Sequence, residues 1–420
     1  MLIVLYTSGT MTHEKSVNSK LAQSVVIVGG GFGGIKAALE LANDKRFQVT
    51  LLSDQSDFRY YPSLYRAATG GAEANSSIPL TSLFDSAEVS VVQGSVTTLD
   101  RKTKTLQLDD GQELHYDILI LSLGVVTNYF GIPGMKEYSY SIKSMEEIKR
   151  LKAHLHQQLS DDRRPDLNYV VIGAGPTGIE LSGVLPEYLK KIMTWHGIKH
   201  RAVHVDLIEA APQLLPRLPK AVANTVARRL KRVGVKLFVG QTVQGVSGDE
   251  LTVSGKPIRS HTVIWTAGVT NHPFFTENNF TLTPRGKVAT DMYLQTDENI
   301  YVIGDNANTP YSGMAQTALY DGSYVAENLK RKADDKDPRS YKVKKPITVI
   351  PVGDHWATVL WGKTRLYGVL GWALREVADL IAFSDYEPWW KAGKQWLSGF
   401  ETEEDCQICR AAYKAAMVDN

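Results

Sequence analysis

The stretch that decides the fold is SVVIVGGGFGG, residues 24–34, which is followed by a segment with helical spacing of apolar residues at 35–41. The β-branched apolar run predicts a buried strand, the glycines predict a tight turn, and the segment after them predicts a helix. A second apolar run at residues 48–52 completes a β-α-β unit of about the length that dinucleotide binding needs.

The same arrangement occurs again later in the chain. YVVIGAGPTG, residues 169–178, contains an apolar run and a second glycine turn, residues 179–189 predict a helix, and residues 203–208 predict the next strand. One Gly-x-Gly-x-x-Gly motif is weak evidence, because glycine turns occur in unrelated loops. Two such motifs, each between a strand and a helix, predict two dinucleotide-binding folds.

Each glycine of these motifs has an expected role. The first permits the tight turn, the middle one lets the backbone approach a pyrophosphate, and the last lets the helix pack on the strand. The helix N-terminus then offers N–H groups and positive dipole to the anion. The positions are Gly29, Gly31 and Gly34 with Phe32 in the first unit, and Gly173, Gly175 and Gly178 with Pro176 and Thr177 in the second.

The residue that ends the second strand of each unit is expected to meet the adenosine ribose. In the second unit this residue is Glu209, whose carboxylate would bind a 2′-hydroxyl and repel a 2′-phosphate, so NADH should be preferred to NADPH. In the first unit the strand ends at Ser53 and Asp54, either of which could reach a ribose hydroxyl. An exposed Asp54 without such a role stays an open alternative.

Other predicted strands also end beside glycines. Residues 116–123 lead into Gly124, residues 262–265 lead into Ala267 and Gly268, and residues 299–303 lead into Gly304 and Asp305. A helix is predicted from about residue 314 to 330, and the charged segment 330–345 predicts a solvated connection.

Length and composition limit the class of protein. With 420 residues the chain should form two or three domains, and 43% hydrophobic and 22% charged residues are globular values. The formal net charge of +2 argues against a nucleic-acid partner. The two cysteines, Cys406 and Cys409, provide no disulfide framework, which favours a reducing compartment. Since no segment reaches roughly 18 uncharged apolar residues, we expect no spanning helix.

These motifs together resemble the two-dinucleotide-binding flavoprotein superfamily and, within it, type II NADH:quinone oxidoreductase. The resemblance runs over roughly residues 24–330 and includes YPSLY at 61–65, TGIE at 177–180, IWTAGV at 264–269 and YVIGD at 301–305. It implies an α/β fold with two Rossmann-like domains, the FAD domain being interrupted by the NADH domain. The expected boundaries are 20–145 and 285–345 for FAD, 146–284 for NADH, and 346–420 for a partly helical, membrane-anchoring or dimerisation region.

The resemblance also implies ligand positions. FAD would lie on the first turn and NADH on the second, with Asp305 on the FAD ribityl chain. The family acid of the first ribose aligns with Ser53. The remaining implied positions are Ser53, Asp54, Pro62, Gly124, Gly304, Ala315 and Gln316 for FAD, and Glu180, Glu209, Ala267 and Gly268 for NADH.

Three residues are the candidates for catalysis. Flavin chemistry needs no amino-acid nucleophile, but Glu180 resembles a family glutamate near the nicotinamide and could relay a proton to a reduced quinone. The family quinone motif, Ala-Gln-x-x-x-Gln, is present as Ala315-Gln316-Thr317-Ala318-Leu319-Tyr320. A tyrosine in place of the second glutamine can stack on a quinone ring and offer a phenolic hydrogen bond. The alternatives are an ordinary helix-face carboxylate for Glu180 and a self-capping side chain for Gln316.

The C-terminal region has the composition of an interfacial membrane anchor. Apolar residues recur at helical spacing over residues 363–383, and tryptophans with nearby lysines suit the headgroup region of a bilayer. The alternative is that the aromatic residues cover the flavin domain or form a dimer interface. We expect a peripheral protein at the cytoplasmic face of the cell membrane, a homodimer, with the acidic residues 401–405 in water. The aromatic and basic residues concerned are Trp372, Trp389, Trp390, Lys391, Lys394 and Trp396.

The leading hypothesis is FAD-dependent, non-proton-pumping oxidation of NADH, with hydride transfer to flavin and two-electron reduction of a membrane quinone. The alternatives are a soluble NAD(P)H oxidase or electron-carrier reductase, a sulfide:quinone-type reductase, and a signalling flavoprotein that resembles apoptosis-inducing factor. Residues 58–70 contain no cysteine pair, which argues against a dithiol reductase. Cys406 and Cys409 supply only half of a tetrahedral zinc site, so no metal site is predicted.

Overall fold

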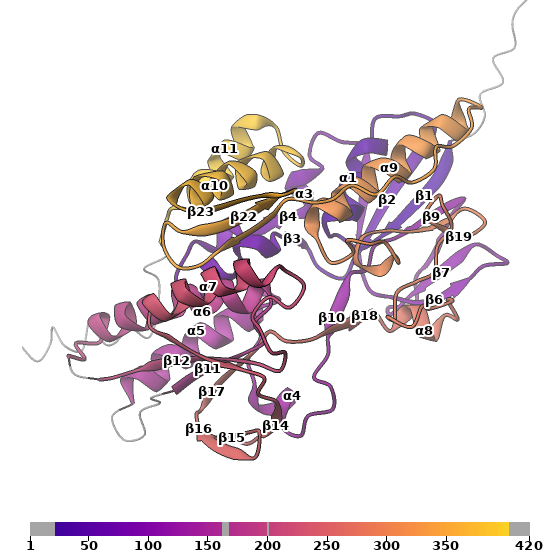
Figure 1. The fold of residues 1–420 in the computed structure, drawn as a ribbon. Helices are drawn as coiled ribbons and strands as arrows, with labels where there is room; N and C mark the ends of the chain where they lie inside the picture. Colours follow the sequence, from indigo (N-terminus) through magenta and orange to yellow (C-terminus); the bar gives the residue numbers. More distant parts are fainter. Residues whose placement is uncertain (1–21, 162–167, 200, 403–420) are drawn as a thin grey trace, which may run out of the picture.

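The computed structural model describes residues 22–161, 168–199 and 201–402 as two sheet domains and a C-terminal unit (Figure 1). Cys406, Cys409 and residues 403–405 lie outside the described residues. In Figure 1 the C-terminal unit lies beside both sheet domains, above the second and to the left of the first.

The first domain is built on a six-stranded sheet in the order β19-β20-β9-β1-β2-β5, in which only the β19–β20 pair is antiparallel. The last strands of this sheet come from a part of the chain far beyond the others, so a second domain interrupts the first, as expected. The elements are β1 (Gln23–Val28), α1 (Phe32–Leu41), β2 (Phe47–Ser53), β5 (Val89–Gln93), β9 (Ile118–Leu121), β19 (Gln295–Asp297), β20 (Ile300–Val302) and α9 (Ala315–Ala333).

The helices α1 and α9 cross with their backbones in direct contact. A Cβ atom on Gly322 would lie 2.4 Å from the carbonyl oxygen of Gly33, and one on Gly33 would lie 3.1 Å from the carbonyl oxygen of Ala318. Only glycine allows this approach, which holds the N-terminal half of α9 against the first turn.

The second domain contains a parallel sheet in the order β13-β12-β11-β17, covered by helices. Its strands are β11 (Asn168–Ile172), β12 (His204–Glu209), β13 (Val235–Val239) and β17 (Thr262–Trp265), and its helices are α5 (Met145–Ser160), α6 (Pro176–Trp195) and α7 (Lys220–Arg232). The smaller elements of both domains are β3 (Asp57–Arg59), α2 (Leu64–Ala68), β4 (Ser77–Pro79), α3 (Leu80–Leu83), β6 (Val96–Asp100), β7 (Thr105–Leu108), β8 (Glu113–His115), α4 (Met135–Tyr138), β14 (Val243–Val246), β15 (Glu250–Val253) and β16 (Lys256–Arg259), with 3-10 turns at Tyr61–Ser63, Glu73–Asn75 and Gly304–Asn306.

A two-stranded antiparallel ribbon joins the two domains. It pairs β10 (Val125–Thr127) with β18 (Val269–Asn271). The chain after the ribbon, including α8 (Phe274–Glu277), returns to the first domain, because Phe274, Phe275 and Phe280 belong to the hydrophobic cluster around β1 and β9. We therefore place the domain boundaries at this ribbon, near residues 127 and 269, and not at the expected 145 and 285.

The C-terminal unit consists of a small antiparallel sheet and two helices. Its elements are β21 (Thr348–Pro351), β22 (Ala357–Trp361), β23 (Thr364–Gly368), α10 (Val369–Ser384) and α11 (Trp389–Ser398). The helical interpretation of residues 363–383 is thus wrong for its first part. Residues 364–368 pair with β22, and Gly368, at φ +82°, ends the strand before α10 begins.

Helix α10 is amphipathic, but its charged side is buried and its apolar side is exposed. Its charged residues are buried against the first domain, whereas four of its apolar residues face outward with more than half of their surface exposed. Among the described residues, no helix is long and apolar enough to cross a bilayer. The buried charges are Arg375, Glu376 and Asp379, and the exposed apolar residues are Val369, Leu370, Val377 and Ile381.

Substituting Gly322 with alanine tests the α1–α9 crossing. We expect Gly322→Ala to destabilise the first domain by about 1–3 kcal/mol, because the added methyl group meets backbone atoms that cannot move aside independently. Gly393→Ala in α11 is the matched control, since a Cβ atom there meets nothing within 4 Å. Thermal unfolding followed by circular dichroism measures the effect, and equal midpoints for the two variants would contradict the crossing.

Candidate functional site

The first glycine turn has the geometry of a nucleotide-binding turn. Gly29 has φ +113° and faces the carbonyl oxygen of Ser122, while a Cβ atom on Gly34 would lie 2.0 Å from the carbonyl oxygen of Gly29. By contrast, a Cβ atom on Gly31 would meet nothing within 4 Å. The middle glycine therefore borders open space at the N-terminus of α1, where an anion could approach. Phe32 begins α1 and is buried.

The second turn repeats this geometry. Gly173 has φ +102° and packs against the backbone of Ala267, and a Cβ atom on Gly178 would lie 1.8 Å from the carbonyl oxygen of Gly173. Gly175 again borders open space, at the start of α6. Since both turns present a helix N-terminus to open space, both fit the pyrophosphate of a dinucleotide.

Three further residues of the predicted site lie at or near the second turn. Pro176 and Thr177 are exposed in the first turn of α6. Gly268 is held against the carbonyl oxygen of Asn128, only 2.4 Å from where its Cβ atom would lie.

The two strand ends differ. Glu209 is fixed by two backbone donors: its Oε2 accepts from the Ala174 N–H at 2.7 Å and its Oε1 accepts from the Ala211 N–H at 2.8 Å. These bonds join the end of β12 to the second turn and leave further lone pairs for a ribose hydroxyl. In the first domain Ser53 is buried and its Oγ accepts from the Gln55 N–H, whereas the neighbouring Asp54 is exposed.

Gly304 and Asp305 form a buried turn after β20. Gly304 has φ +64°, the Asp305 carboxylate accepts from the Gly313 N–H at 3.0 Å, and the Lys287 ammonium donates to the Asp305 carbonyl oxygen. Burial raises the pKa of Asp305 above its usual range. The carboxylate therefore lies in a protected position where a hydroxylated ligand chain could meet it.

Sequence reasoning missed two residues that support this turn. Asp321 accepts from the Gly304 N–H at 3.0 Å and from the Tyr341 hydroxyl at 2.7 Å, and its burial raises its pKa to about 6. Asn306 accepts from the Gly124 N–H at 2.9 Å and donates to the Gly124 carbonyl oxygen at 2.6 Å. A polar residue at a helix position that faces the core was the one available signal for Asp321.

Glu180 lies where the two domains and α10 meet. Its neighbouring charged groups are Arg375, Asp379 and Arg66. Its own charge contributes to raising the pKa of Tyr65. The side chain keeps some exposed surface, yet its surroundings are dense enough that burial raises the pKa of Glu180 to about 8. Arg375 opposes this shift and Asp379 adds to it. At neutral pH the carboxyl group therefore retains its proton and can donate it.

A buried network of ion pairs fastens α10 over Glu180. Arg375 pairs with Asp379 and donates to the carbonyl oxygen of Pro62 at 2.8 Å. The hydroxyl of Tyr60 donates to Asp379 at 2.5 Å. A second pair joins Arg66 Nη2 to Glu376 Oε1 at 2.5 Å. The sequence signal for this network was a group of charges at positions i, i+1 and i+4 of an otherwise apolar helix.

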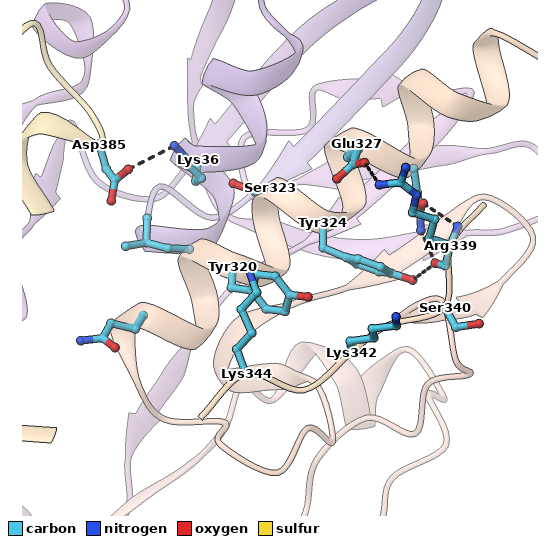
Figure 2. A pocket seen from close by; sticks show the side chains of 13 residues that line it. Lys36, Tyr320, Ser323, Tyr324, Glu327, Arg339, Ser340, Lys342, Lys344 and Asp385 are labelled. Atoms are coloured by element: carbon cyan, nitrogen blue, oxygen red, sulfur yellow. Dashed lines mark hydrogen bonds and ion pairs between the residues drawn. The ribbon is translucent and has the colours of Figure 1, made fainter. Parts of the chain in front are cut away.

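Ala315, Gln316 and Tyr320 lie on the first turns of α9. The Gln316 amide forms two hydrogen bonds to the backbone of Ile347, at 2.9 and 3.2 Å, so it holds the chain that enters the C-terminal unit. Tyr320 faces the segment after α9, where the Lys344 ammonium lies 4.0 Å from the centre of its ring (Figure 2). Both residues line one groove, which does not include Glu180. Their part in quinone chemistry stays a prediction.

Solved structures with similar folds support this architecture. An NDH2 from Plasmodium falciparum in complex with NADH aligns with a TM-score of 0.79 at 16% identity, over 90% of this chain and 97% of that one. A sulfide:quinone oxidoreductase from Aquifex aeolicus aligns with a TM-score of 0.74 at 20% identity, over 92% and 98%. At these identities the likeness establishes the fold, including its C-terminal part.

Relatives are also found by sequence. Type II NADH:quinone oxidoreductases from Staphylococcus saprophyticus and Staphylococcus aureus are each 26% identical over 359 residues, which cover 79% of this chain and 88% of the relative. The family model for pyridine nucleotide-disulphide oxidoreductases matches residues 23–322, which include both glycine turns and the Gly304–Asp305 turn. The chain therefore belongs to the pyridine nucleotide-disulphide oxidoreductase family.

Proposed function

We propose that this protein is a type II NADH:quinone oxidoreductase that binds FAD on its first turn and NADH on its second. The observation that carries the proposal is the position of Glu180, a protonated carboxyl group on the NADH-site helix, which lies close to Tyr65 and Arg66 of α2 in the first domain and to Arg375 and Asp379 of α10. The staphylococcal relatives carry this activity in their names, and the residues of both turns fit dinucleotides.

In this proposal, particular residues bind the two nucleotides and hold the proton. Gly31 and Gly175 admit the two pyrophosphates, Asp305 meets the ribityl chain of FAD, and Glu209 meets the NADH ribose. When bound beside these residues, FAD would supply the two-electron chemistry that links NADH to the quinone. Glu180 holds a proton near this place, and the positive charge of Arg375 limits how far burial raises the pKa of its carboxyl group. Helix α10 carries Arg375 and Asp379 beside Glu180 and limits the access of water to it.

A sulfide:quinone reductase has a similar fold but is disfavoured. Such an enzyme needs cysteines near the flavin, and the chain has only Cys406 and Cys409, both outside the described residues. The same lack of cysteine disfavours a dithiol reductase.

The exposed apolar face of the C-terminal unit supports a peripheral membrane location. Trp389 and Trp390 on α11 are 78% and 59% exposed, and α10 directs Val377 and Ile381 outward. Tryptophan at headgroup depth with aliphatic residues below it is typical of interfacial helices, and a quinone dissolved in the bilayer requires such contact. We place the enzyme at the cytoplasmic face of the cell membrane. A homodimer stays a prediction.

Replacing the carboxyl group of Glu180 tests its role as proton donor. In the wild type, quinone reduction should slow as the pH rises through about 8, because the proton is bound below the pKa of Glu180 and lost above it. Glu180→Gln should lower the rate of quinone reduction roughly 100-fold and abolish this pH dependence. Stopped-flow reoxidation of the flavin by a short-chain quinone measures both effects. Glu187→Gln, on the exposed side of α6, is the control, and an unchanged pH profile in Glu180→Gln would refute the assignment.

Glu209→Gln tests nucleotide selection. The amide keeps an oxygen for one backbone N–H but removes the negative charge that repels a 2′-phosphate, so the preference for NADH over NADPH should fall at least about tenfold. The ratio of kcat/KM for the two nucleotides measures the effect. Glu250→Gln, exposed on β15, is the control. Unchanged discrimination would remove Glu209 from the ribose site.

The double variant Trp389→Ser/Trp390→Ser tests membrane docking. If both rings enter the headgroup region, their loss should weaken binding to phosphatidylcholine vesicles by about 3 kcal/mol, since each buried aromatic ring contributes roughly half of this. Phe130→Ser/Tyr138→Ser removes exposed rings from the second domain as a control. Cosedimentation with vesicles measures binding. If instead the double variant keeps its affinity for vesicles and loses self-association, the face is a contact between copies of the chain.

A further inference from the structure

The groove of about 710 Å³ that Gln316 and Tyr320 line lies beside α9, apart from the two glycine turns and from Glu180 (Figure 2). One wall is α9, with Tyr320 and Ser323. The other wall is the linker, residues 334–347, which runs from α9 to β21 and contributes Lys342 and Lys344. The linker is held in place, because the Tyr341 hydroxyl donates to Asp321 and the backbone of Ile347 is bound by Gln316. The groove is therefore a built feature of the fold.

The groove carries uncompensated positive charge. Two of its cations are neutralised, since Lys36 pairs with Asp385 at 3.4 Å and Arg339 pairs with Glu327 at 2.7 Å. Within the described part of the chain, neither Lys342 nor Lys344 forms an ion pair. The Lys344 ammonium lies 4.0 Å from the ring centre of Tyr320, and this cation–π contact holds it over the groove.

Hydroxyl groups complete the chemistry of an anion site. Ser323 on α9 and Ser340 on the linker line the same space, and Figure 2 shows Lys342 beside Ser340. The ammonium and hydroxyl groups along the groove are all hydrogen-bond donors, which suits an anionic headgroup because phosphate oxygens accept several hydrogen bonds.

The groove is continuous with the exposed apolar face of α10. Its lining includes Asp385, the residue that ends α10, and the Asp385 N–H bonds the carbonyl oxygen of Ile381 one turn earlier. Ile381 is 59% exposed and belongs to the apolar row that we place against the bilayer. A lipid whose acyl chains contact this row would therefore bring its headgroup to the mouth of the groove.

We propose that the groove binds the phosphate headgroup of an acidic phospholipid. This inference rests on the membrane docking in the proposed function and adds a lipid preference to it. The apolar row of α10 and the tryptophans of α11 supply affinity for any bilayer, whereas Lys342 and Lys344 select for acidic lipid. The strength of this selection falls as salt screens the charges.

Vesicle cosedimentation of the FAD-loaded protein tests the proposal. Binding is compared for vesicles of phosphatidylcholine alone and for vesicles that also contain phosphatidylglycerol. The three proteins are the wild type, the groove variant Lys342→Gln/Lys344→Gln and the control Lys102→Gln/Lys104→Gln. The control removes the same charge from the exposed turn between β6 and β7. The wild type and the control should prefer the acidic vesicles. The groove variant should lose about 30-fold of its affinity for them, as expected for two lysines, and bind neutral vesicles like the wild type.

The outcomes separate the groove from the proposed function. Two results would overturn the proposal that the groove binds lipid. One is that the groove variant binds acidic vesicles as tightly as the wild type, and the other is that the groove variant and the control lose equal affinity. Free glycerol phosphate is added at the same ionic strength as a competitor. If it removes the preference of the wild type for acidic vesicles and leaves binding to neutral vesicles unchanged, the groove binds a soluble phosphate compound and the lipid proposal is refuted. NADH-dependent reduction of a short-chain soluble quinone is measured in parallel, and its absence in the wild type overturns the proposed function independently of any vesicle.

Discussion

The buried charges of α10 determine how the parts of this molecule are held together. Arg375, Glu376 and Asp379 are almost completely removed from water, and each finds a partner either within the helix or on the first domain. Removing one partner of such a buried pair destabilises a protein by about 3–5 kcal/mol, so the partners on the first domain hold α10 in this orientation once the helix has packed. Its apolar side must then face outward. One arrangement of charges thus encloses Glu180 and produces the exposed face that we assign to the membrane.

The two nucleotide turns show how one backbone solution serves two ligands. Both begin with a glycine at positive φ, both place a carbonyl oxygen where a Cβ atom would clash, and both leave the middle glycine beside open space. The strand ends then differ. The carboxylate of Glu209 is held by two backbone donors of its own domain, whereas the hydroxyl of Ser53 is occupied by its own loop. The Ser53 hydroxyl still has its own O–H donor and a second lone pair, so both Ser53 and the exposed Asp54 stay predictions for the first ribose.

Local patterns predicted the strands that lead into glycine turns in both nucleotide folds to within a few residues, whereas β5, β13 and α7 were not predicted. Apolar runs that end on glycine specify a strand and a turn through their own chemistry, so β1, β11 and β17 follow from the sequence. Which side of α10 is buried did not follow from the sequence, because an amphipathic pattern indicates two faces and leaves open which of them is buried. That choice depends on Tyr60 and Arg66, some 310 residues away in the chain.

Contacts between distant segments explain the other differences. Residues 364–368 became a strand because β22 offers a hydrogen-bonding edge. The boundary of the second domain moved because three phenylalanines after β18 fill the core of the first. Gln316 matches a family motif by position, and its amide also binds the backbone of Ile347, which the motif does not predict. No periodicity in the sequence reports such pairings.

Glu180 is covered by α10, a part of the same chain, and not by the bilayer. The groups that raise the pKa of Glu180 all come from this polypeptide, and the side of α10 that faces outward contributes none of them. The acid strength of Glu180 should therefore not depend on lipid composition or on whether the protein is embedded or extracted. In the function that we propose, the bilayer controls how quinone arrives and the folded chain sets the proton chemistry, so we expect a detergent-extracted enzyme to be limited by substrate delivery rather than by a damaged active site.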